Sequence, residues 1–390
     1  MKTKGISLAF AMAFVGAVTV IGQQQPRDAG RTPGVQAGAD PNRAAFIMAN
    51  CKNPAAAAPA PAGGGRAAPG GPGAPGGAPG GAPGGGRGAG GAPPAPAGPA
   101  AYSVTAIPNV IAAGQKWKTL WEDSGNNSDS PIGVADGVLV AQNDKSQILK
   151  VGLNGKVELV ATDTYTGGAL AKTKDGKLYV GERALNRAIW QVQPERKLFA
   201  DKKDGEPLEC LGAGVLNDLV ADSKGGMYMT MGGVYYANPQ GVVMGRYGTI
   251  GGNGIILSKD DKTLYVTGRL MGAMPPADLK LPAGAPMPNG GMVAYDVQPD
   301  GSLTNERQFT WAGGDGSAVD DAGRIYTTGN NGVWVVSPTG ELLGFIPSPY
   351  NLISVAFGGP GGKTLFGVAI RDVHILAIDT IAKGIQSRPK

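Results

Sequence analysis

The sequence has few of the residues on which much enzyme chemistry depends, with one histidine and two cysteines in 390 residues. Zinc sites are usually built from His and Cys, and a thiol nucleophile generally needs a histidine partner. His374 gives no sign of being such a partner, and we interpret it as a packed residue at a strand edge. A bond between Cys51 and Cys210 would close a long low-complexity loop, so we interpret them as two isolated thiols.

Charged residues and long apolar runs are also scarce. Charged side chains make up 17% of the chain and the formal net charge is +5, which is too small and too scattered to indicate nucleic-acid binding. The one long apolar run, residues 6–21, follows Lys2 and Lys4 and ends at a small-residue site near Gly22. This pattern is typical of a signal peptide over 1–22 and predicts export to the periplasm or the extracellular space. A retained membrane anchor is the alternative, and otherwise we expect no stable membrane insertion.

Residues 23–101 form a low-complexity region. From residue 54 to residue 100 the chain is almost entirely Ala, Pro and Gly, with little to bury on folding. We therefore predict a disordered tether over 23–101. Within it, the segment 40–52 is expected to form one or two helical turns.

A repeated unit fills the rest of the chain, 102–390. In each unit a polar or small residue opens a short apolar strand, and a turn ending in Gly or Asp follows eight positions later. The opening residues are Asp129, Gly168, Asn217, Asn253, Asp315 and Ser354. Further β-rich strands follow in each unit, which predicts an all-β, six-bladed β-propeller with the opening residues around its axis. The strand at 116–121 is expected to complete the last blade and close the ring.

Several motifs in this region resemble one known family. They are LNDLVAD at 216–222, GNGIILS at 252–258 with KTLYV at 262–266, YDV at 295–297 with DGSLT at 300–304, DGSAVD at 315–320, and VAFGG at 355–359. Between residues 123 and 378 the chain resembles the gluconolactonase and senescence-marker-protein (regucalcin) family. That family implies a six-bladed propeller with one axial divalent cation and hydrolysis of sugar lactones or similar esters.

The resemblance also implies roles for individual residues. Asn253 and Asp315 match metal ligands, Asp315 also matches the catalytic acid/base, and Asn217 matches a substrate-binding asparagine. The third ligand, usually Glu in Glu-Gly-Pro, corresponds to Asp129 in Asp129-Ser130-Pro131. Val215 stands where family members carry a substrate-binding arginine. Candidates to replace that arginine are Arg183, Arg269 and Arg371. We predict that Arg183 binds substrate. The ordinary explanation of each of the three is a solvated charge on the surface.

The chemistry of these side chains suits a hard cation. Asp and Asn oxygens favour Ca²⁺, with Mg²⁺, Mn²⁺ and Zn²⁺ as alternatives. Such an ion would polarise an ester carbonyl while Asp315 accepts a proton from the attacking water. Gly168 and Ser354 are expected to leave room near the axis, and Asp218 to make a structural bond to a neighbouring loop. The loop 269–290 is a candidate lid.

Two function classes follow from these observations. The first is a metal-dependent lactonase or esterase that acts on a small molecule, does not bind nucleic acid and is a monomer. The second is a non-catalytic secreted propeller that binds a ligand or a protein partner, with the axial metal in a structural role. A paraoxonase-like or strictosidine-synthase-like propeller is a third option, and the histidine chemistry of a paraoxonase-like site has only His374 to draw on.

Overall fold

Glycine turns and strands rich in β-branched and aromatic residues build the structure. The turns between first and second strands place a glycine in the left-handed region, as at Gly176 (φ 89°), Gly225 (φ 91°) and Gly323 (φ 81°). A glycine adopts this conformation without the steric cost that a side chain would bring. The strands that follow these turns are almost wholly buried.

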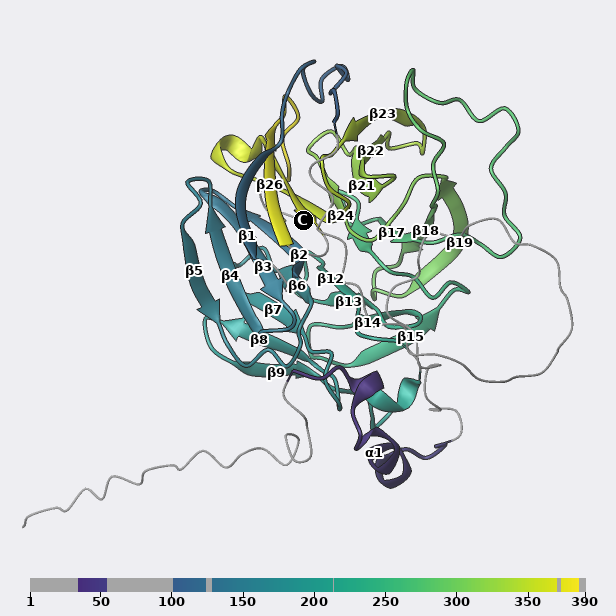
Figure 1. The fold of residues 1–390 in the computed structure, drawn as a ribbon. Coiled ribbons are helices and arrows are strands. Elements are labelled where there is room, and N and C mark those ends of the chain that lie inside the picture. Colours follow the sequence, from purple (N-terminus) through teal and green to yellow (C-terminus); the bar gives the residue numbers. More distant parts are fainter. Residues whose placement is uncertain (1–33, 55–100, 124–127, 213, 370–372, 386–390) are drawn as a thin grey trace, which may run out of the picture.

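The computed structural model describes residues 34–54, 101–123, 128–212, 214–369 and 373–385, and it confirms an all-β propeller of six blades with very little helix (Figure 1). The predicted signal peptide (1–22) and the Ala/Pro/Gly stretch (55–100) lie outside the described residues. Blade one contains β2 (Ser128–Val134), β3 (Gly137–Gln142), β4 (Gln147–Gly152) and β5 (Val157–Ala161). Blade two contains β6 (Ala169–Lys172), β7 (Leu178–Gly181), β8 (Ile189–Gln193) and β9 (Lys197–Ala200). Blade three contains β12 (Asp218–Ala221), β13 (Met227–Thr230), β14 (Val234–Ala237) and β15 (Val243–Tyr247).

The second half of the ring repeats the same antiparallel meander. Blade four contains β16 (Ile255–Leu257), β17 (Thr263–Thr267), β18 (Met292–Val297) and β19 (Leu303–Thr310). Blade five contains β20 (Ser317–Val319), β21 (Ile325–Gly329), β22 (Gly332–Val336) and β23 (Leu342–Pro347). Blade six contains β24 (Leu352–Gly358), β25 (Thr364–Ala369), β26 (Val373–Asp379) and β1 (Lys118–Asp123).

The ring closes where the sequence predicts. β1 pairs antiparallel with β26, from Lys118 opposite Ala377 to Asp123 opposite Val373. The first strands of successive blades contact one another, and β2 contacts β24 across the closure. The predicted opening residues therefore surround the axis, either just before the first strand of a blade or, for Asp129 and Ser354, inside it.

The hydrophobic core lies between neighbouring blades. One cluster joins blades three, four and five, and its fully buried side chains include Tyr228, Tyr295 and Trp334. A second cluster joins blades five and six to the segment that precedes β1. Burial of both faces of the inner strands explains their continuous apolar runs, and it makes each blade a rigid support for the residues at the axis.

The N-terminal segment 34–54 packs on the propeller and departs from the disordered tether predicted over 23–101. It contains a short 3₁₀ helix (Ala37–Ala39) and α1 (Arg43–Asn50), which confirms the expected helical turns. In Figure 1 α1 lies beside blades two and three, next to the 3₁₀ helix Leu208–Leu211. A two-stranded ribbon, β10 (Lys202–Lys203) and β11 (Glu206–Pro207), precedes that helix.

The prediction of two isolated thiols is wrong. Cys51 and Cys210 form a disulfide. Arg43 of α1 also donates from Nε to the fully buried Glu209 at 2.7 Å. Glu209 accepts two more hydrogen bonds, both from Arg187, at 2.8 and 2.9 Å. The docked helix brings Cys51 to the propeller beside Cys210, so the separation of 159 residues along the chain does not prevent the bond.

Across the described residues, no helix is both long and apolar enough to cross a membrane.

Candidate functional site

Three threonines hold the starts of the innermost strands in place. They lie at the ends of second strands and are Thr230 (β13), Thr267 (β17) and Thr328 (β21). The Thr230 hydroxyl accepts from the N–H of Asp218 at 3.2 Å and donates to the carbonyl oxygen of Asn253, in the next blade, at 2.5 Å. The Thr328 hydroxyl accepts from the N–H of Asp315 at 3.1 Å and donates to a carbonyl oxygen of blade six at 3.3 Å. These bonds fix the backbones of Asn253 and Asp315.

Asn253 and Asp315 occupy adjacent positions in this ring. The residue after Asn253 is Gly254, and a Cβ placed on it would lie 1.7 Å from the carbonyl oxygen of Asp315. Only glycine permits this close approach of the two backbones. The structure therefore brings together two of the residues that the sequence predicts as metal ligands.

Arg183 connects the other two predicted residues. Its Nη2 donates to Oδ2 of Asp129 at 3.0 Å and to the carbonyl oxygen of Asn217 at 2.6 Å, and its Nε donates to the carbonyl oxygen of Leu216 at 3.0 Å. The side chains of Arg183 and Asp129 are only 6% and 14% exposed. Solvated surface charge is therefore the wrong explanation of Arg183, which is a buried cation beside the axis.

Two small features make room for this guanidinium. When the Asn143 amide is oriented to donate to the Gly167 carbonyl oxygen at 3.1 Å, its oxygen accepts from Nη1 of Arg183 at 2.8 Å. A Cβ placed on Gly168 would lie 2.1 Å from the same Nη1. The expectation that Gly168 leaves room is confirmed, and the space is filled by Arg183.

The backbone of Arg183 is also held on both sides. Its N–H donates to the carbonyl oxygen of Tyr165 at 3.2 Å, and its carbonyl oxygen accepts from the N–H of Ala37 at 2.8 Å. Ala37 belongs to the docked N-terminal segment and is 1% exposed. The segment anchored by the disulfide thus supports the loop that carries Arg183.

Asp129 has partners on both carboxylate oxygens. Oδ1 accepts from the N–H of Ser130 at 2.7 Å, and Oδ2 accepts from Arg183. Burial raises the pKa of Asp129 above its usual value; the Arg183 guanidinium opposes this shift and the nearby Asp218 carboxylate adds to it. The charge of Asp129 is therefore matched by an arginine within the protein.

Asp218 has the structural role expected from the sequence. Its Oδ2 accepts from the N–H of Ile255, in the next blade, at 3.0 Å. Its Oδ1 accepts from the Ser130 hydroxyl of blade one at 3.3 Å and from the N–H of Leu219 at 2.9 Å. Asp218, the first residue of β12, thus links blades one, three and four.

The predicted cation ligands divide into two groups. Asn253 Oδ1 is buried with no hydrogen-bond partner among the described residues, which suits an atom reserved for a ligand. Asp129 does not suit a cation, because Arg183 already neutralises it. The three-residue set Asp129, Asn253 and Asp315 therefore does not fit a divalent ion as a whole. In the part of the chain that the structure describes, no cluster of three or more His, Cys, Asp or Glu could hold a metal.

The other candidate residues lie apart from this centre or have packing roles. Arg269 donates from Nε to the carbonyl oxygen of Gly290 at 2.7 Å and lies 5.8 Å from the Trp311 ring. Arg371 lies outside the described residues. His374 stacks on Tyr350 with ring centroids 3.9 Å apart, which agrees with a packed residue, but β26 lies between β1 and β25, so His374 is not on an edge strand.

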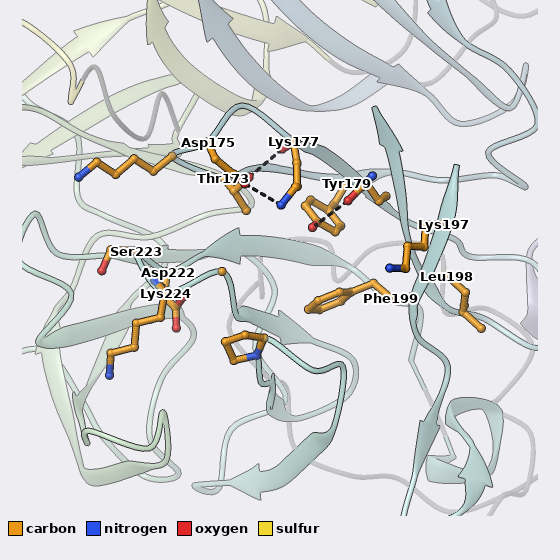
Figure 2. Close-up of a pocket in the computed structure, with 14 residues that line it drawn as sticks. Thr173, Asp175, Lys177, Tyr179, Lys197, Leu198, Phe199, Asp222, Ser223 and Lys224 are labelled. Carbon is orange, nitrogen blue, oxygen red and sulfur yellow. Dashed lines mark hydrogen bonds and ion pairs between the residues drawn. The ribbon is translucent and has the colours of Figure 1, made fainter. Parts of the chain in front are cut away.

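A cavity also lies away from this site. It has a volume of about 550 Å³ and lies between blades two and three, where Figure 2 shows Tyr179 and Phe199 on one side and Asp222 and Lys224 on the other. Its walls include the β6–β7 and β12–β13 turns, which lie at the opposite end of the innermost strands from Asn217, and residues of β7, β8 and β9. None of the predicted site residues lines it.

The family model described as "SMP-30/Gluconolactonase/LRE-like region" matches residues 138–371, which is more than half of the 390 residues. The chain belongs to this family. The resemblance drawn from the motifs at 216–222, 252–258 and 315–320 is confirmed, and all three motifs lie inside the matched region.

Solved structures agree on the fold. A gluconolactonase from Xanthomonas campestris superposes with a TM-score of 0.58 at 20% identity, covering 74% of this chain and 98% of that one. The calcium-binding protein regucalcin from Agrobacterium tumefaciens superposes with a TM-score of 0.52 at 18% identity, covering 68% of this chain and 94% of that one. No curated protein sequence matches the chain significantly. At these identities the structural likeness shows the shared propeller alone.

Proposed function

We propose that this protein hydrolyses a sugar-derived lactone or a related small ester at the axial site, with Asp315 as the general base. The observation that carries the proposal is the placement of Asn217, Asn253 and Asp315 at the starts of three consecutive innermost strands. Membership of the gluconolactonase-like family supports the same class of reaction and a small-molecule substrate.

The reaction requires one proton acceptor and a place for developing negative charge. The Asp315 carboxylate takes a proton from water as the water oxygen attacks the lactone carbonyl carbon. The carbonyl oxygen becomes negative, and the buried positive charge of Arg183 favours that change. When the ring C–O bond breaks, Asp315 returns the proton to the leaving oxygen, and the product is a hydroxy acid. Asn217 and Asn253 offer amide groups to substrate hydroxyls or to the attacking water.

The family resemblance implies one divalent cation, for which the Asp and Asn oxygens favour calcium, and a regucalcin of similar fold is calcium-binding. Asn253 and Asp315 are the two ligands that such an ion would still find here. No step of the proposed reaction depends on it, because Asp129 is paired with Arg183.

The decisive variant is Asp315→Asn, which keeps the shape of the side chain and removes the base. We expect hydrolysis of a panel of five- and six-membered sugar lactones and aryl esters, followed by pH-stat, to fall at least about 100-fold. Asp300→Asn, an exposed carboxylate in the turn between β18 and β19, is the matched control and should retain the wild-type rate. Equal rates for Asp315→Asn and wild type would eliminate this mechanism.

A non-catalytic binding role is the second candidate function. It is favoured by the Asp129–Arg183 pair and by Val215, both of which depart from the pattern that the resemblance implies. In that case the panel compounds would protect the protein against thermal unfolding without being consumed.

We further propose that the protein is exported and acts as a monomer. The Cys51–Cys210 disulfide supports export, because such bonds persist in oxidising compartments. Fractionation of the producing cells tests the location, and light scattering during size-exclusion chromatography tests the monomer.

A further inference from the structure

The axis of this propeller carries a fixed cation of its own. We infer that the Arg183 guanidinium takes the place beside Asp129 that the family resemblance assigns to a divalent metal ion, so that the site binds no calcium while Arg183 is there. The inference concerns the source of the positive charge at the proposed hydrolytic site. It rests on the proposed function only where it predicts that hydrolysis needs no metal ion.

Hydrogen bonds hold the Arg183 guanidinium in one defined position. Four of its five N–H groups have acceptors: the carbonyl oxygens of Leu216 and Asn217, Oδ2 of Asp129 and the amide oxygen of Asn143. The planar, permanently charged group matches these fixed acceptors better than a lysine would. One N–H on Nη1 remains for a ligand oxygen.

Space at the ring is arranged for this side chain. Gly168 is the ring residue of blade two, and a Cβ there would clash with Nη1 at 2.1 Å. The left-handed conformation is not required at this position, so alanine suits the backbone of Gly168, and the three atoms nearest to its Cβ all belong to the Arg183 guanidinium. Gly168 and Arg183 therefore act as a pair.

Charge also opposes a metal ion beside Arg183. Asp129, Asp218 and Asp315 bring three carboxylates to the neighbourhood of the axis; Arg183 pairs with Asp129, and Asp218 already accepts three hydrogen bonds from Ser130, Leu219 and Ile255. A divalent cation next to Asp129 would meet the guanidinium within contact distance in a site from which water is largely excluded. The remaining ligands, Asn253 and Asp315, then offer a single carboxylate, which is a weak set for Ca²⁺.

The experiment measures calcium binding by isothermal titration without substrate. We expect no 1:1 binding of Ca²⁺ to the wild-type protein at micromolar concentrations. Arg183→Gln and Gly168→Ala should each gain a single Ca²⁺ site that is at least about tenfold tighter than any binding by the wild type, because the first removes the positive charge beside Asp129 and the second displaces it. Asn253→Ala added to either variant should abolish the gained site. Arg307→Gln, which removes an exposed arginine paired with Asp296, is the control for net charge and should gain none.

Each outcome decides the question. Tight 1:1 calcium binding by the wild type, lost in Asn253→Ala, would overturn the inference, and so would variants that remain folded by circular dichroism and gain no site. If Arg183→Gln fails to fold, Gly168→Ala still tests the position with the arginine present. Hydrolysis measured in parallel should resist EDTA in the wild type. A protein that hydrolyses nothing yet gains calcium in the variants would refute the proposed function and leave this inference intact.

Discussion

At the scale of single residues, equivalent positions around the axis have been given different tasks. The six ring positions share one register, yet Gly168 makes room for an arginine, Asp129 neutralises it, and Asn253 keeps a buried oxygen with no partner in the described part of the chain. The residues that fix these positions are the threonines at the ends of second strands. The hydroxyls of Thr230 and Thr328 join one blade to the next, so a loss there should affect both stability and the site.

Thr230→Val tests this connection, because valine has nearly the same shape and lacks the hydroxyl. The carbonyl oxygen of Asn253 would lose its 2.5 Å bond in a buried place, and the N–H of Asp218 would lose its 3.2 Å acceptor. We expect the free energy of unfolding to fall by about 1–3 kcal/mol in urea titrations. The specificity constant kcat/KM should fall as well, because Asn253 is released.

Thr230→Ser is the matched control, since it restores the hydroxyl and removes a methyl group. It should recover most of the activity. If serine and valine gave the same loss of activity, packing of the methyl groups rather than the hydrogen bond would explain the effect.

At the scale of elements, the loop between β15 and β16 leads directly to Asn253 and is held by one carboxylate. Glu306 on β19 accepts from the Thr249 N–H at 2.8 and 3.0 Å, from the Thr249 hydroxyl at 2.9 Å and from the Tyr295 hydroxyl at 2.6 Å. Burial alone would raise the pKa of Glu306, but the bonds from Tyr295 and Thr249 together lower it below its usual value.

The lowered pKa makes the contribution of Glu306 dependent on pH. A carboxylate with a folded-state pKa below its unfolded value of 4.5 stabilises the protein above that pH and loses the effect as the pH falls through the folded-state pKa. Glu306→Gln should therefore lower the free energy of unfolding by roughly 1 kcal/mol at pH 7, a small value because Thr249 is exposed. The difference from wild type should shrink as the pH falls below 4.5 and vanish once the pH is below the folded-state pKa. Thermal unfolding of both proteins across this range measures it, with the exposed Glu341→Gln as the control, and a difference independent of pH would contradict the assignment.

The elements also show how far sequence reasoning reaches. The register of Asp129, Asn217, Asn253 and Asp315 predicted their meeting, because a repeated pattern of turns and strands fixes a repeated place in a propeller. The same reasoning could not predict that Arg183 is buried beside the axis, because the sequence around a loop arginine does not show whether that arginine is solvated or buried. Gly168 in the ring was the available signal, because a missing side chain there leaves a space that some other group must fill.

Two contacts between residues far apart in the chain were also not predicted. Cys51 and Cys210 are joined because α1 docks through the buried Arg43–Glu209 pair, and neither contact has a local signature in the chain. The composition of residues 54–100 indicated a low-complexity stretch. The prediction of a disordered tether was wrongly extended to the segment 34–54, which precedes it. Local patterns therefore predicted the blades and the ring, and only tertiary packing disclosed what supports the site.

At the scale of the whole molecule, the axial site depends on a closed ring. The last blade is assembled from both ends of the propeller, with β1 from the N-terminal side paired to β26 from the C-terminal side. Trp117, just before β1, donates from Nε1 to the carbonyl oxygen of Pro347 in blade five at 2.9 Å. If this closure opens, β26 becomes an exposed sheet edge and the starts of β2 and β24 are free to separate, which would move Asp129 away from Arg183.

Leu120→Ala tests the closure without touching the site. Leu120 is the buried side chain of β1, 9% exposed, and packs in the cluster that joins blades one and six. Its truncation should lower the free energy of unfolding by about 2–3 kcal/mol, at the low end for buried leucines because the strand lies at the edge of the blade. Thr119→Ala, on the exposed face of the same strand, should change it by less than about 0.5 kcal/mol. Since the whole ring shares this closure, unfolding followed by tryptophan fluorescence and by far-ultraviolet circular dichroism should shift together. A shift confined to one probe would mean that blade six opens alone, and that the axial residues keep their places without it.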